Sequence, residues 1–393
     1  MTAEVVVSGY GVFTAFGFGE PAIRKGVFAG VPAFAGVTRF DASRYRVRVA
    51  AEYRDGPGAV PRQRQVLLRC ARAALDMAGL AGGFDAAVLI GTQGDYTTIN
   101  EFWRGHHDPA RPGAEPVPRP DLGHSAPAAH ADAIADAFGI RGRRMAFVNG
   151  CVASANAIIH GYRLIAAGHA EVAVCGGAYV VDEEFFAKFD SGRAFATDGR
   201  LRAFSADRSG LLLGDGAAVL VLEAARSARA RSAPSLARVA GWGMASDAYH
   251  VCRPDPGGHG LAAAVGQALR RAGVRGEDVG YVNAHGTGTA LNDSAETRAL
   301  RAAFGSRAHR VPVSSTKTTT GHTLEAAGAV EAVITMLALR HGELPPTAGY
   351  SRPDPACDLD YVPNRARPAD PRYALSVNSA FGGLNTALVL ERR

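Results

Sequence analysis

A single cysteine stands at the junction between an apolar stretch and a run of small residues. The sequence reads FVNGCVASANA over 147–157, which predicts a short strand, a tight turn at a glycine and a helix, with Cys151 at the apex. A thiol at the start of a helix faces the positive end of the helix dipole and unpaired N–H groups, which favour the thiolate. Cys151 is therefore a candidate nucleophile, and a buried structural cysteine is the alternative. We interpret the remaining cysteines as structural: Cys70, Cys175, Cys252 and Cys357.

Two histidines lie on glycine-flanked turns later in the chain. His285 belongs to YVNAHGTGT at 281–289, just past a predicted strand, and His322 ends SSTKTTTGH at 314–322, where an alanine-rich helix begins. An imidazole at a helix N-terminus is biased towards its neutral form, because the dipole opposes positive charge. A neutral imidazole can donate one N–H to an oxygen, as an oxyanion stabiliser must. The pattern indicates a thiol nucleophile assisted by two N–H donors.

Charged residues near the histidines have two interpretations each. Lys317 precedes His322 and Glu331 follows it on the predicted helix, so the two could form a buried salt bridge that holds the loop. An ordinary surface lysine is the alternative. In the segment after His285, Asp293 makes a reasonable N-cap with Glu296 at the third helical position, a start resembling a capping box. We expect that second pair to have a structural role.

A glycine-rich turn precedes the last predicted strand. The segment 378–385 reads NSAFGGLN, with two consecutive glycines between strand-like runs. Such a turn can present backbone N–H groups to a substrate oxygen, here from Phe381 and Gly382. Without Cys151 nearby it would be merely a tight turn. Its interpretation therefore depends on the fold bringing the two segments together.

The elements that must position these residues are duplicated in the chain. Five segments recur in the same order: 7–12 with 239–244, 74–80 with 268–274, 88–95 with 281–289, 151–167 with 322–340, and 216–223 with 384–391. We predict two βα-rich halves, 1–225 carrying the cysteine and 235–393 carrying the histidines. Apolar strands alternating with helices indicate buried sheets covered by helices, and a pseudo-twofold axis would bring the glycine-rich turns together. Additional material at 20–61 and 100–125 is expected to form surface caps or subunit contacts.

Composition limits the possible classes of function. The 393 residues are 47% hydrophobic and 20% charged, an ordinary globular composition, and the net charge is +6. Basic residues are scattered without a run or an aromatic-interleaved stripe, which argues against nucleic-acid binding. The chain opens without a signal-peptide pattern and has no apolar run long enough to span a membrane. The five cysteines have no metal-ligand spacing and suggest reduced thiols, so we expect a cytoplasmic protein.

The same motifs, in this order, resemble the β-ketoacyl-ACP synthases, condensing enzymes of the thiolase-like superfamily. The resemblance covers nearly the whole chain, and the AHGT loop paired with the KTTTGH loop is its most specific part. The segments that carry it are SGYGVFTAFG at 8–17, the cysteine turn at 147–157, RAFSADRSGLLLGDGAAVLVLE at 202–223, GWGMASDAYH at 241–250, YVNAHGTGTALNDSAE at 281–296, VSSTKTTTGHTLEAAGAVEA at 313–332 and NSAFGGLN at 378–385. It implies an α/β fold of five layers, α-β-α-β-α, built from two duplicated halves.

The resemblance also implies a role for each matching residue. Cys151 would take an acyl chain from an acyl carrier protein as a thioester. His285 and His322 would bind the malonyl thioester and stabilise the enolate formed as carbon dioxide leaves. Lys317, paired with Glu331, would hold the histidine loop. The backbone N–H groups of Cys151 and Phe381 would form the oxyanion hole, and Phe381, next to Gly382, would gate the acyl pocket. No cofactor and no metal are implied, and members act as dimers, here with a second copy or with a related ketosynthase-like partner.

Three departures from the family pattern bear on the substrate. The cysteine turn reads Asn149-Gly150-Cys151-Val152-Ala153 instead of the usual hydroxyl-bearing form, NSAFGGLN is one residue shorter than usual, and Glu325 replaces a usual glycine. These changes favour a specialised polyketide enzyme over a housekeeping fatty acid elongase. A non-catalytic partner resembling a chain-length factor is the alternative, although such proteins lack the cysteine. A thiolase would need a second cysteine in the late turn, where Ala380-Phe381 stands.

Overall fold

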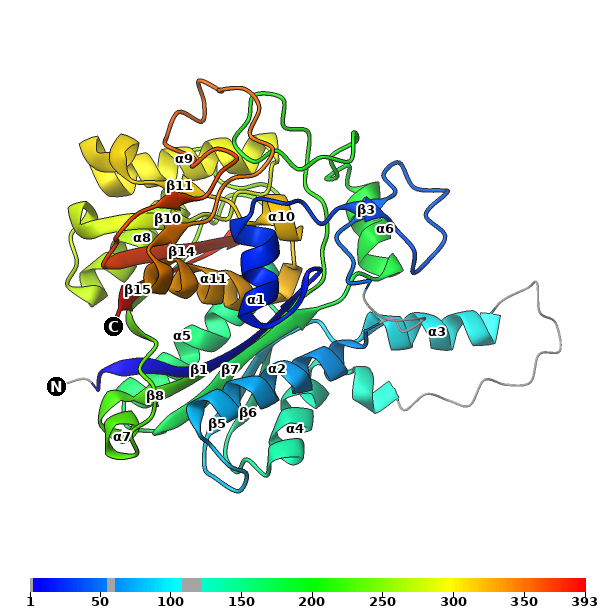
Figure 1. The fold of residues 1–393 in the computed structure, drawn as a ribbon. Coiled ribbons are helices and arrows are strands. Elements are labelled where there is room, and N and C mark those ends of the chain that lie inside the picture. Colours follow the sequence, from blue (N-terminus) through cyan, green and yellow to red (C-terminus); the bar gives the residue numbers. More distant parts are fainter. Residues whose placement is uncertain (1–2, 55–60, 108–121) are drawn as a thin grey trace.

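The computed structural model describes residues 3–54, 61–107 and 122–393 (Figure 1). Two groups of strands stack above one another with helices between and outside them. The first group holds the strands of the N-terminal half: β1 Val5–Thr14, β8 Gly216–Ala224, β7 Val172–Tyr179, β5 Ala87–Gly91 and β6 Arg144–Phe147. The second holds those of the C-terminal half: β9 Ala237–Ser246, β15 Leu384–Arg392, β14 Tyr373–Ala380, β10 Val279–Asn283 and β11 Val313–Ser314.

The two groups have the same pairing pattern. In the first, β1, β8 and β7 pair antiparallel in turn, and β7, β5 and β6 then pair parallel. In the second, β9, β15 and β14 pair antiparallel, and β14, β10 and β11 pair parallel. The groups join where Val6 and Val7 of β1 pair with Arg238 and Ala237 of β9. This repeated topology confirms the predicted duplication.

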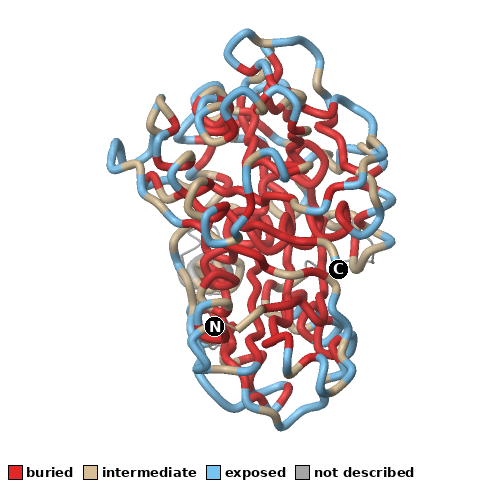
Figure 2. The backbone as a smooth tube through the Cα atoms, turned by 90° about the vertical axis from the view of Figure 1, so that its left-hand side faces the viewer, coloured by how far each residue is buried: buried red, intermediate tan, exposed pale blue. Residues whose placement is uncertain are grey.

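Helices complete the predicted α-β-α-β-α architecture. The middle layer consists of α5 Ala153–Ala166 and α11 Ala327–His341, which contact each other between the sheets. Every residue of α11 from Ala327 to Leu339 is buried, as expected for a helix that is apolar on all sides. The outer layers are α2 Gln63–Ala78 with α4 Pro127–Phe138, and α8 His259–Ala272 with α9 Ala290–Phe304. Figure 2 shows the buried backbone concentrated along the middle of the molecule.

The duplicated glycines of β1 and β9 allow close strand–helix packing. A Cβ atom at Gly9 would lie 2.1 Å from the carbonyl oxygen of Ala74 on α2. At the equivalent position of the second half, a Cβ at Gly241 would lie 2.3 Å from the carbonyl oxygen of Ala268 on α8. Both distances are too short for a side chain, so each strand requires glycine where its covering helix crosses it.

The segment 20–61, predicted to be a surface cap or subunit contact, also packs into the core. It includes α1 Gly19–Ile23 and a π-helical turn at Arg24–Phe28, and Ile23 is fully buried. Arg39 forms a buried ion pair with Asp215, which anchors the segment to the end of the sheet. Residues 55–60 and 108–121, parts of the two predicted additions, lie outside the described residues.

The remaining elements are β2 Gly17–Phe18, β3 Ala35–Gly36, β4 Val49–Ala50, α3 Tyr96–His107, α6 Glu183–Ser191, α7 Ala225–Ala230, α10 Lys317–Thr320, β12 Glu343–Leu344 and β13 Arg367–Pro368.

Candidate active site

The cysteine turn has the predicted strand–turn–helix form. Strand β6 ends at Phe147, a 3-10 turn spans Gly150–Val152, and α5 begins at Ala153. Gly150 has φ +64°, a left-handed conformation that glycine adopts without strain. This local geometry places Cys151 immediately before the middle-layer helix, where it keeps partial exposure.

The His322 turn brings an imidazole to the cysteine. Gly321 has φ +74° and ψ 172°, a region accessible almost only to glycine. The backbone of His322 is held on both sides, since its N–H donates to Leu212 O at 2.7 Å and its carbonyl accepts from Gly214 N at 3.1 Å. Its Nε2 lies 3.1 Å from the Sγ of Cys151. The side chain is 1% exposed, so the contact is shielded from bulk water.

His285 completes the group. It follows β10, and its own N–H and that of Gly286 each donate to the Glu296 carboxylate at 2.7 Å. The His285 ring meets the His322 ring edge to face, with centroids 5.3 Å apart and planes at 84°. In the described part of the chain, neither histidine's Nδ1 atom has a hydrogen-bond partner. The structure thus brings together the thiol and the two imidazoles that the sequence predicted.

Asp293 and Glu296 do not form the predicted capping box. Helix α9 begins at Ala290 with Thr289 as its N-cap, so both acids lie inside the helix. Both are buried, and Asp293 accepts hydrogen bonds from Phe204 N at 2.7 Å and Gly288 N at 3.2 Å. The two carboxylates therefore hold the backbone of the histidine loop. The role of these two acids is structural, as expected, but they accept hydrogen bonds from loop N–H groups instead of capping the helix.

Lys317 and Glu331 form a buried ion pair. The Lys317 side chain is 1% exposed and contacts the carboxylate of Glu331 on α11. The other Glu331 oxygen accepts from Asn378 Nδ2 at 2.6 Å. The surface-lysine alternative is therefore wrong. The pair joins the His322 loop, the central helix and the end of β14.

Burial controls the ionisation of all three reactive groups. It holds the pKa of His285 and of His322 well below the ordinary value, and the nearby Lys317 cation acts in the same direction. The imidazoles are therefore neutral, as predicted. Burial also raises the pKa of the Cys151 thiol to about 12, with the Glu325 carboxylate as the next cause. The prediction that the thiolate form of Cys151 is favoured is therefore wrong for the site without substrate. Desolvation of the thiol outweighs the helix-dipole effect of a short turn.

The late glycine-rich turn lies beside the cysteine turn. Strands β14 and β15 form a hairpin there, and a Cβ built at Gly150 would contact the Ala380 side chain at 3.6 Å. The Gly382 N–H donates to Val251 O at 2.8 Å, so it is not available to a substrate oxygen. Of the two predicted donors in this turn, Phe381 remains.

One aromatic partner of this turn was missed by the sequence analysis. The Phe381 side chain is 58% exposed, and its ring stacks on Phe189 of α6 with centroids 5.8 Å apart. The signal was the aromatic run EEFFAKF at 183–189, which had no assigned role. The stack joins the hairpin to α6, so movement of Phe381 requires separation from Phe189.

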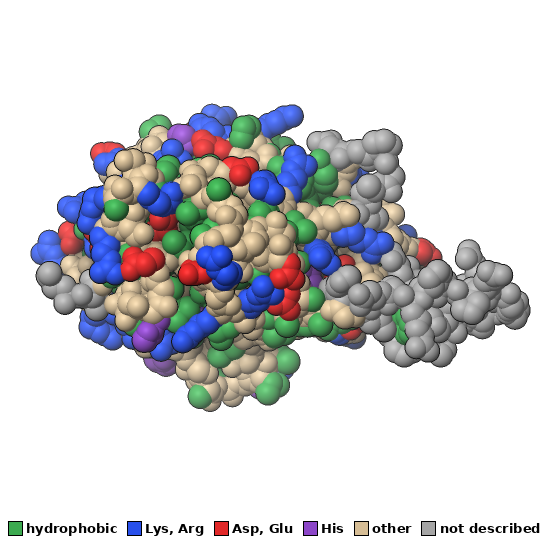
Figure 3. All heavy atoms as spheres, turned by 90° about the horizontal axis from the view of Figure 1, so that it is seen from below, with side chains coloured by type: hydrophobic (Ala, Val, Ile, Leu, Met, Phe, Trp, Pro, Cys, Tyr) green, Lys and Arg blue, Asp and Glu red, His purple; other side chains and the backbone are tan. Residues whose placement is uncertain are grey.

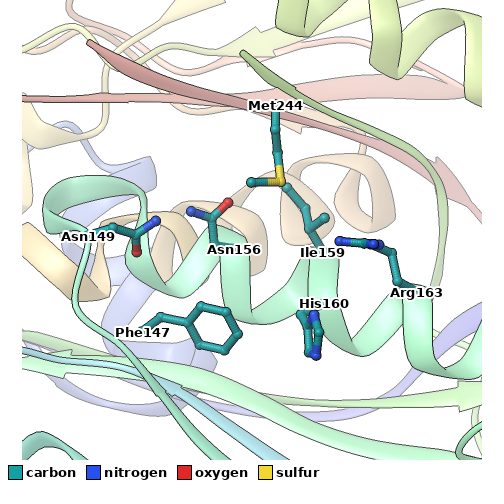
Figure 4. Close-up of a pocket in the computed structure, with 7 residues that line it drawn as sticks. All are labelled: Phe147, Asn149, Asn156, Ile159, His160, Arg163 and Met244. Carbon is teal, nitrogen blue, oxygen red and sulfur yellow. The ribbon is translucent and has the colours of Figure 1, made fainter. Parts of the chain in front are cut away.

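A cavity of about 180 Å³ lies on the other side of the cysteine turn (Figure 4). Its lining comes from β6, α5 and β9 and does not include the thiol or the two imidazoles: Phe147, Asn149, Asn156, Ile159, His160, Arg163 and Met244. The amide oxygens of Asn149 and Asn156 are buried and have no hydrogen-bond partner among the described residues. The cavity is therefore separate from the reactive group but directly adjoins its turn.

Several other features limit the chemistry of the chain. All five cysteines are free, and Cys252 is exposed whereas Cys70, Cys175 and Cys357 are buried. Within residues 3–54, 61–107 and 122–393, no three acidic, histidine or cysteine side chains are grouped to hold a metal ion. No helix in these ranges has both the length and the apolar character required to cross a membrane. Figure 3 shows one face on which basic and acidic side chains are interspersed.

A partly exposed thiol beside two buried, neutral imidazoles, in a duplicated five-layered fold, defines a site for acyl transfer through a thioester. Comparison with known proteins agrees. Family models described as the N-terminal and C-terminal domains of β-ketoacyl synthase match residues 2–228 and 236–351. The chain belongs to the β-ketoacyl synthase family, whose members are acyltransferases of the condensing-enzyme type.

Relatives from two kinds of pathway match nearly the full chain. The alpha subunit of the tetracenomycin polyketide synthase ketoacyl synthase of Streptomyces glaucescens is 36% identical, covering 99% of this chain and 97% of that protein. A 3-oxoacyl-(acyl-carrier-protein) synthase 2 of Coxiella burnetii is 34% identical, covering 99% and 98%. The ishigamide ketosynthase/chain length factor structure matches with a TM-score of 0.92, 33% identity and full coverage of both chains. These similarities support the thiolase-like fold and the condensing-enzyme class.

Proposed function

We propose that this chain extends an acyl group held as a thioester on Cys151 by two carbons taken from a malonyl-acyl carrier protein. The observation that carries this proposal is the 3.1 Å contact between Cys151 Sγ and His322 Nε2, with the His285 ring beside it. This arrangement offers a nucleophile, a base for its proton and two N–H donors for an enolate oxygen. No metal or cofactor is required by these steps.

In the first half-reaction, His322 takes the proton of the Cys151 thiol as the sulfur attacks the carbonyl carbon of an acyl-carrier thioester. A raised thiol pKa makes this proton transfer necessary, since little free thiolate exists near neutral pH. The new Cys151 S–C bond forms, and the bond between the acyl carbon and the carrier sulfur breaks. The imidazolium then returns the proton to the departing carrier thiolate. Backbone N–H groups of Cys151 and Phe381 are proposed to hold the intermediate oxyanion.

In the second half-reaction, the neutral rings of His285 and His322 each donate one N–H to the malonyl thioester oxygen. The C–C bond to the malonyl carboxylate breaks, carbon dioxide leaves, and the electron pair becomes the enolate. The enolate carbon attacks the acyl carbon on Cys151, which forms the new C–C bond and breaks the Cys151 S–C bond. The product is a β-ketoacyl-carrier thioester, and the released cysteine thiolate takes up a proton from solvent.

The Lys317–Glu331 pair is proposed to keep the imidazoles neutral and in place. Lys317 is a cause of the lowered pKa of both histidines, and Glu331 fixes its ammonium group between α11 and Asn378. A neutral ring donates one N–H to the carbonyl oxygen of the substrate. This hydrogen bond strengthens as that oxygen gains electron density while carbon dioxide leaves. The pair therefore acts through the histidines and does not itself contact substrate.

The proposed partners are an acyl carrier protein and a second ketosynthase-like chain, either a copy of this one or a related subunit. Among the described strands, β6 is at the edge of its sheet; Met145 on it is 38% exposed, and Val148 just after it is 51% exposed. An exposed, partly apolar edge strand is suited to pairing with another strand. The unpaired amide oxygens of Asn149 and Asn156 in the cavity behind it would accept donors from that partner. A cytoplasmic location is also proposed, which the five free cysteines support.

Acylation of Cys151 tests this function. The purified chain, alone and with candidate carrier proteins bearing acyl groups, is analysed by intact-protein mass spectrometry, with Cys151→Ala as the control. We expect an acyl mass gain that depends on Cys151, followed by a two-carbon extension when malonyl-carrier is added. A polyketide-type carrier is the preferred donor, given the relative from Streptomyces glaucescens. Absence of a Cys151-dependent gain in the presence of its partner chain would instead favour the chain-length-factor alternative.

A further inference from the structure

Glu325 is a buried acid beside the nucleophile. It lies in the 3-10 turn Leu324–Ala326, three positions after His322, and is 2% exposed. This turn contacts the Cys151 turn on one side and β7 on the other, where a Cβ at Gly177 would lie 2.9 Å from the Glu325 carbonyl oxygen. Glu325 stands where the family pattern usually has a glycine, and a charged side chain ordinarily lies at the protein surface. The structure instead encloses the carboxyl within the protein, close enough to Cys151 to influence its ionisation.

Polar groups from separate elements surround this carboxyl. Burial raises the pKa of this carboxyl, hydrogen bonding to Gln93, just beyond β5, lowers it, and the charge of Asp182 at the N-cap of α6 raises it further. Tyr179 ends β7 and stands two residues after Gly177, so it is on the same face of the strand as the position that meets the Glu325 turn. Strands β5, β6 and β7 run parallel, so Gln93, Cys151 and Tyr179 all follow the carboxyl ends of neighbouring strands. In α/β sheets this edge is where ligands bind.

The cluster contains a donor that the protein does not satisfy. Tyr179 is 3% exposed, and in the described part of the chain its O–H proton has no acceptor. Leaving a buried donor unpaired is costly, and so is placing an apolar group directly against a buried carboxyl. A purely alkyl chain would leave the Tyr179 donor unpaired and would add an apolar neighbour to the Glu325 carboxyl. A hydroxyl would satisfy both, because its oxygen can accept from Tyr179 while its proton is donated to Glu325.

We propose that Glu325 and Tyr179 form a specificity subsite for a hydroxyl group on the acyl chain loaded onto Cys151. The accepted substrate class is then an acyl thioester that carries a hydroxyl within the first few carbons of the thioester. The inference rests on the proposed function, because it requires Cys151 to hold the chain. Such a substrate must be supplied by a reaction that reduces a ketone or hydrates a double bond near the thioester.

The test compares three N-acetylcysteamine thioesters: hexanoyl, 3-hydroxyhexanoyl and 5-hydroxyhexanoyl. The initial rate of acyl mass gain on Cys151 is measured with the full chain and its partner present. A buried site built for a hydroxyl should favour one of the hydroxylated chains over hexanoyl by about tenfold or more. In Glu325→Gly that preference should fall to about onefold to twofold, largely because hexanoyl loads faster once the carboxyl is gone.

Two further variants separate recognition from folding. Tyr179→Phe removes only the hydroxyl donor and should lower the preference by about threefold to tenfold. Glu184→Gln is the matched control: it neutralises a partly exposed acid on α6 that pairs with Lys188, and it should leave the preference unchanged. Equal loading of all three chains by the unmodified protein, or an unchanged preference in Glu325→Gly, would overturn this inference alone. Failure of every thioester to acylate Cys151 would overturn the proposed function together with it.

Discussion

The two turns that begin the central helices are related by the duplication but carry different chemistry. In the N-terminal half, Gly150 precedes Cys151 and a 3-10 turn leads into α5. In the C-terminal half, Gly321 precedes His322, and another 3-10 turn leads into α11. Both glycines have positive φ, at +64° and +74°. One backbone design therefore presents a sulfur from one half and an imidazole from the other.

The surroundings of the two turns also differ. Helix α11 is buried along its length, whereas α5 borders an open cavity through His160 and Arg163. The His322 side chain is 1% exposed, but Cys151 keeps partial access. This asymmetry suits the chemistry, because the nucleophile must meet a substrate carbonyl while the proton acceptor and enolate donor benefit from exclusion of water. Duplication supplied two equivalent positions, and burial then distinguished their functions.

The largest effect is expected from removing the sulfur. Cys151→Ala should lose acyl loading by more than about a thousandfold, since no other group of the site can form the thioester. The matched control is Cys252→Ala, which removes the exposed thiol. Intact-protein mass spectrometry after incubation with an acyl-carrier thioester gives the measurement. Loading that persists in Cys151→Ala and disappears in Cys252→Ala would reverse the assignment of the nucleophile.

The next effect concerns the buried charge pair behind the His322 turn. Lys317→Met leaves the Glu331 carboxylate without its cation, and breaking a buried pair from one side costs about 3–5 kcal/mol of unfolding free energy. Adding Glu331→Gln removes the second charge and should recover part of this loss. Urea denaturation of the single and double variants measures both values. If Lys317→Met were as stable as the unmodified chain, the His322 turn would not depend on the Lys317–Glu331 pair.

The two histidines should separate the two half-reactions. His285→Ala should slow malonyl decarboxylation by about a hundredfold to a thousandfold while acylation of Cys151 continues, because this ring does not contact the sulfur. His322→Ala should slow both steps, since its Nε2 lies 3.1 Å from Cys151 Sγ. Carbon dioxide release and acyl mass gain are measured in parallel. Intact decarboxylation in His285→Ala would remove this histidine from the proposed enolate site.

Much of this comparison was predictable from the sequence because its causes are local. Glycine spacing in β1 and β9 reflects close strand–helix packing, so Gly9 and Gly241 mark the same position in each half. The turns at Cys151 and His322 have a glycine, a reactive residue and small side chains in short succession. These signals predicted the duplication and the meeting of the thiol with two imidazoles, whereas the five layers were implied by the resemblance to the β-ketoacyl-ACP synthases.

The properties that the sequence did not predict depend on residues far apart in the chain. The raised pKa of Cys151 comes from burial and from Glu325, which belongs to the other half. Asp293 was expected to cap its own helix but accepts the N–H of Phe204. Gly382 was expected to face substrate but donates to Val251. Local patterns indicate which residues can do chemistry, whereas ionisation and free donors are set by tertiary neighbours.

The glycines of the two turns should differ in their tolerance of a side chain. A Cβ at Gly150 would meet its nearest neighbour at an ordinary 3.6 Å, so Gly150→Ala should cost about 1–2 kcal/mol for the left-handed backbone alone. A Cβ at Gly321 would lie 2.6 Å from the carbonyl oxygen of Leu213, in a conformation almost exclusive to glycine. Gly321→Ala should therefore be less stable than Gly150→Ala. Urea denaturation of the matched pair checks the order, and equal losses would show that the two turns are equally constrained.

The smallest expected effect is the influence of Glu325 on the ionisation of Cys151. It tests the electrostatic coupling between the two halves, because Glu325 follows His322 in one turn and the thiol belongs to the other turn. Burial raises the pKa of Glu325 to about 7, so its carboxyl is mostly protonated at pH 6 and mostly charged at pH 8. The charged form disfavours the Cys151 thiolate, and Glu325→Gln removes that charge.

Alkylation of Cys151 by iodoacetamide should then be about threefold to tenfold faster in the variant at pH 8, which corresponds to a thiol pKa lower by about half a unit to one unit. At pH 6 the two rates should nearly coincide, since both side chains are neutral there. A Cys252→Ala background removes the exposed thiol from the measurement, and a rate ratio independent of pH would show that Glu325 does not control the ionisation of Cys151.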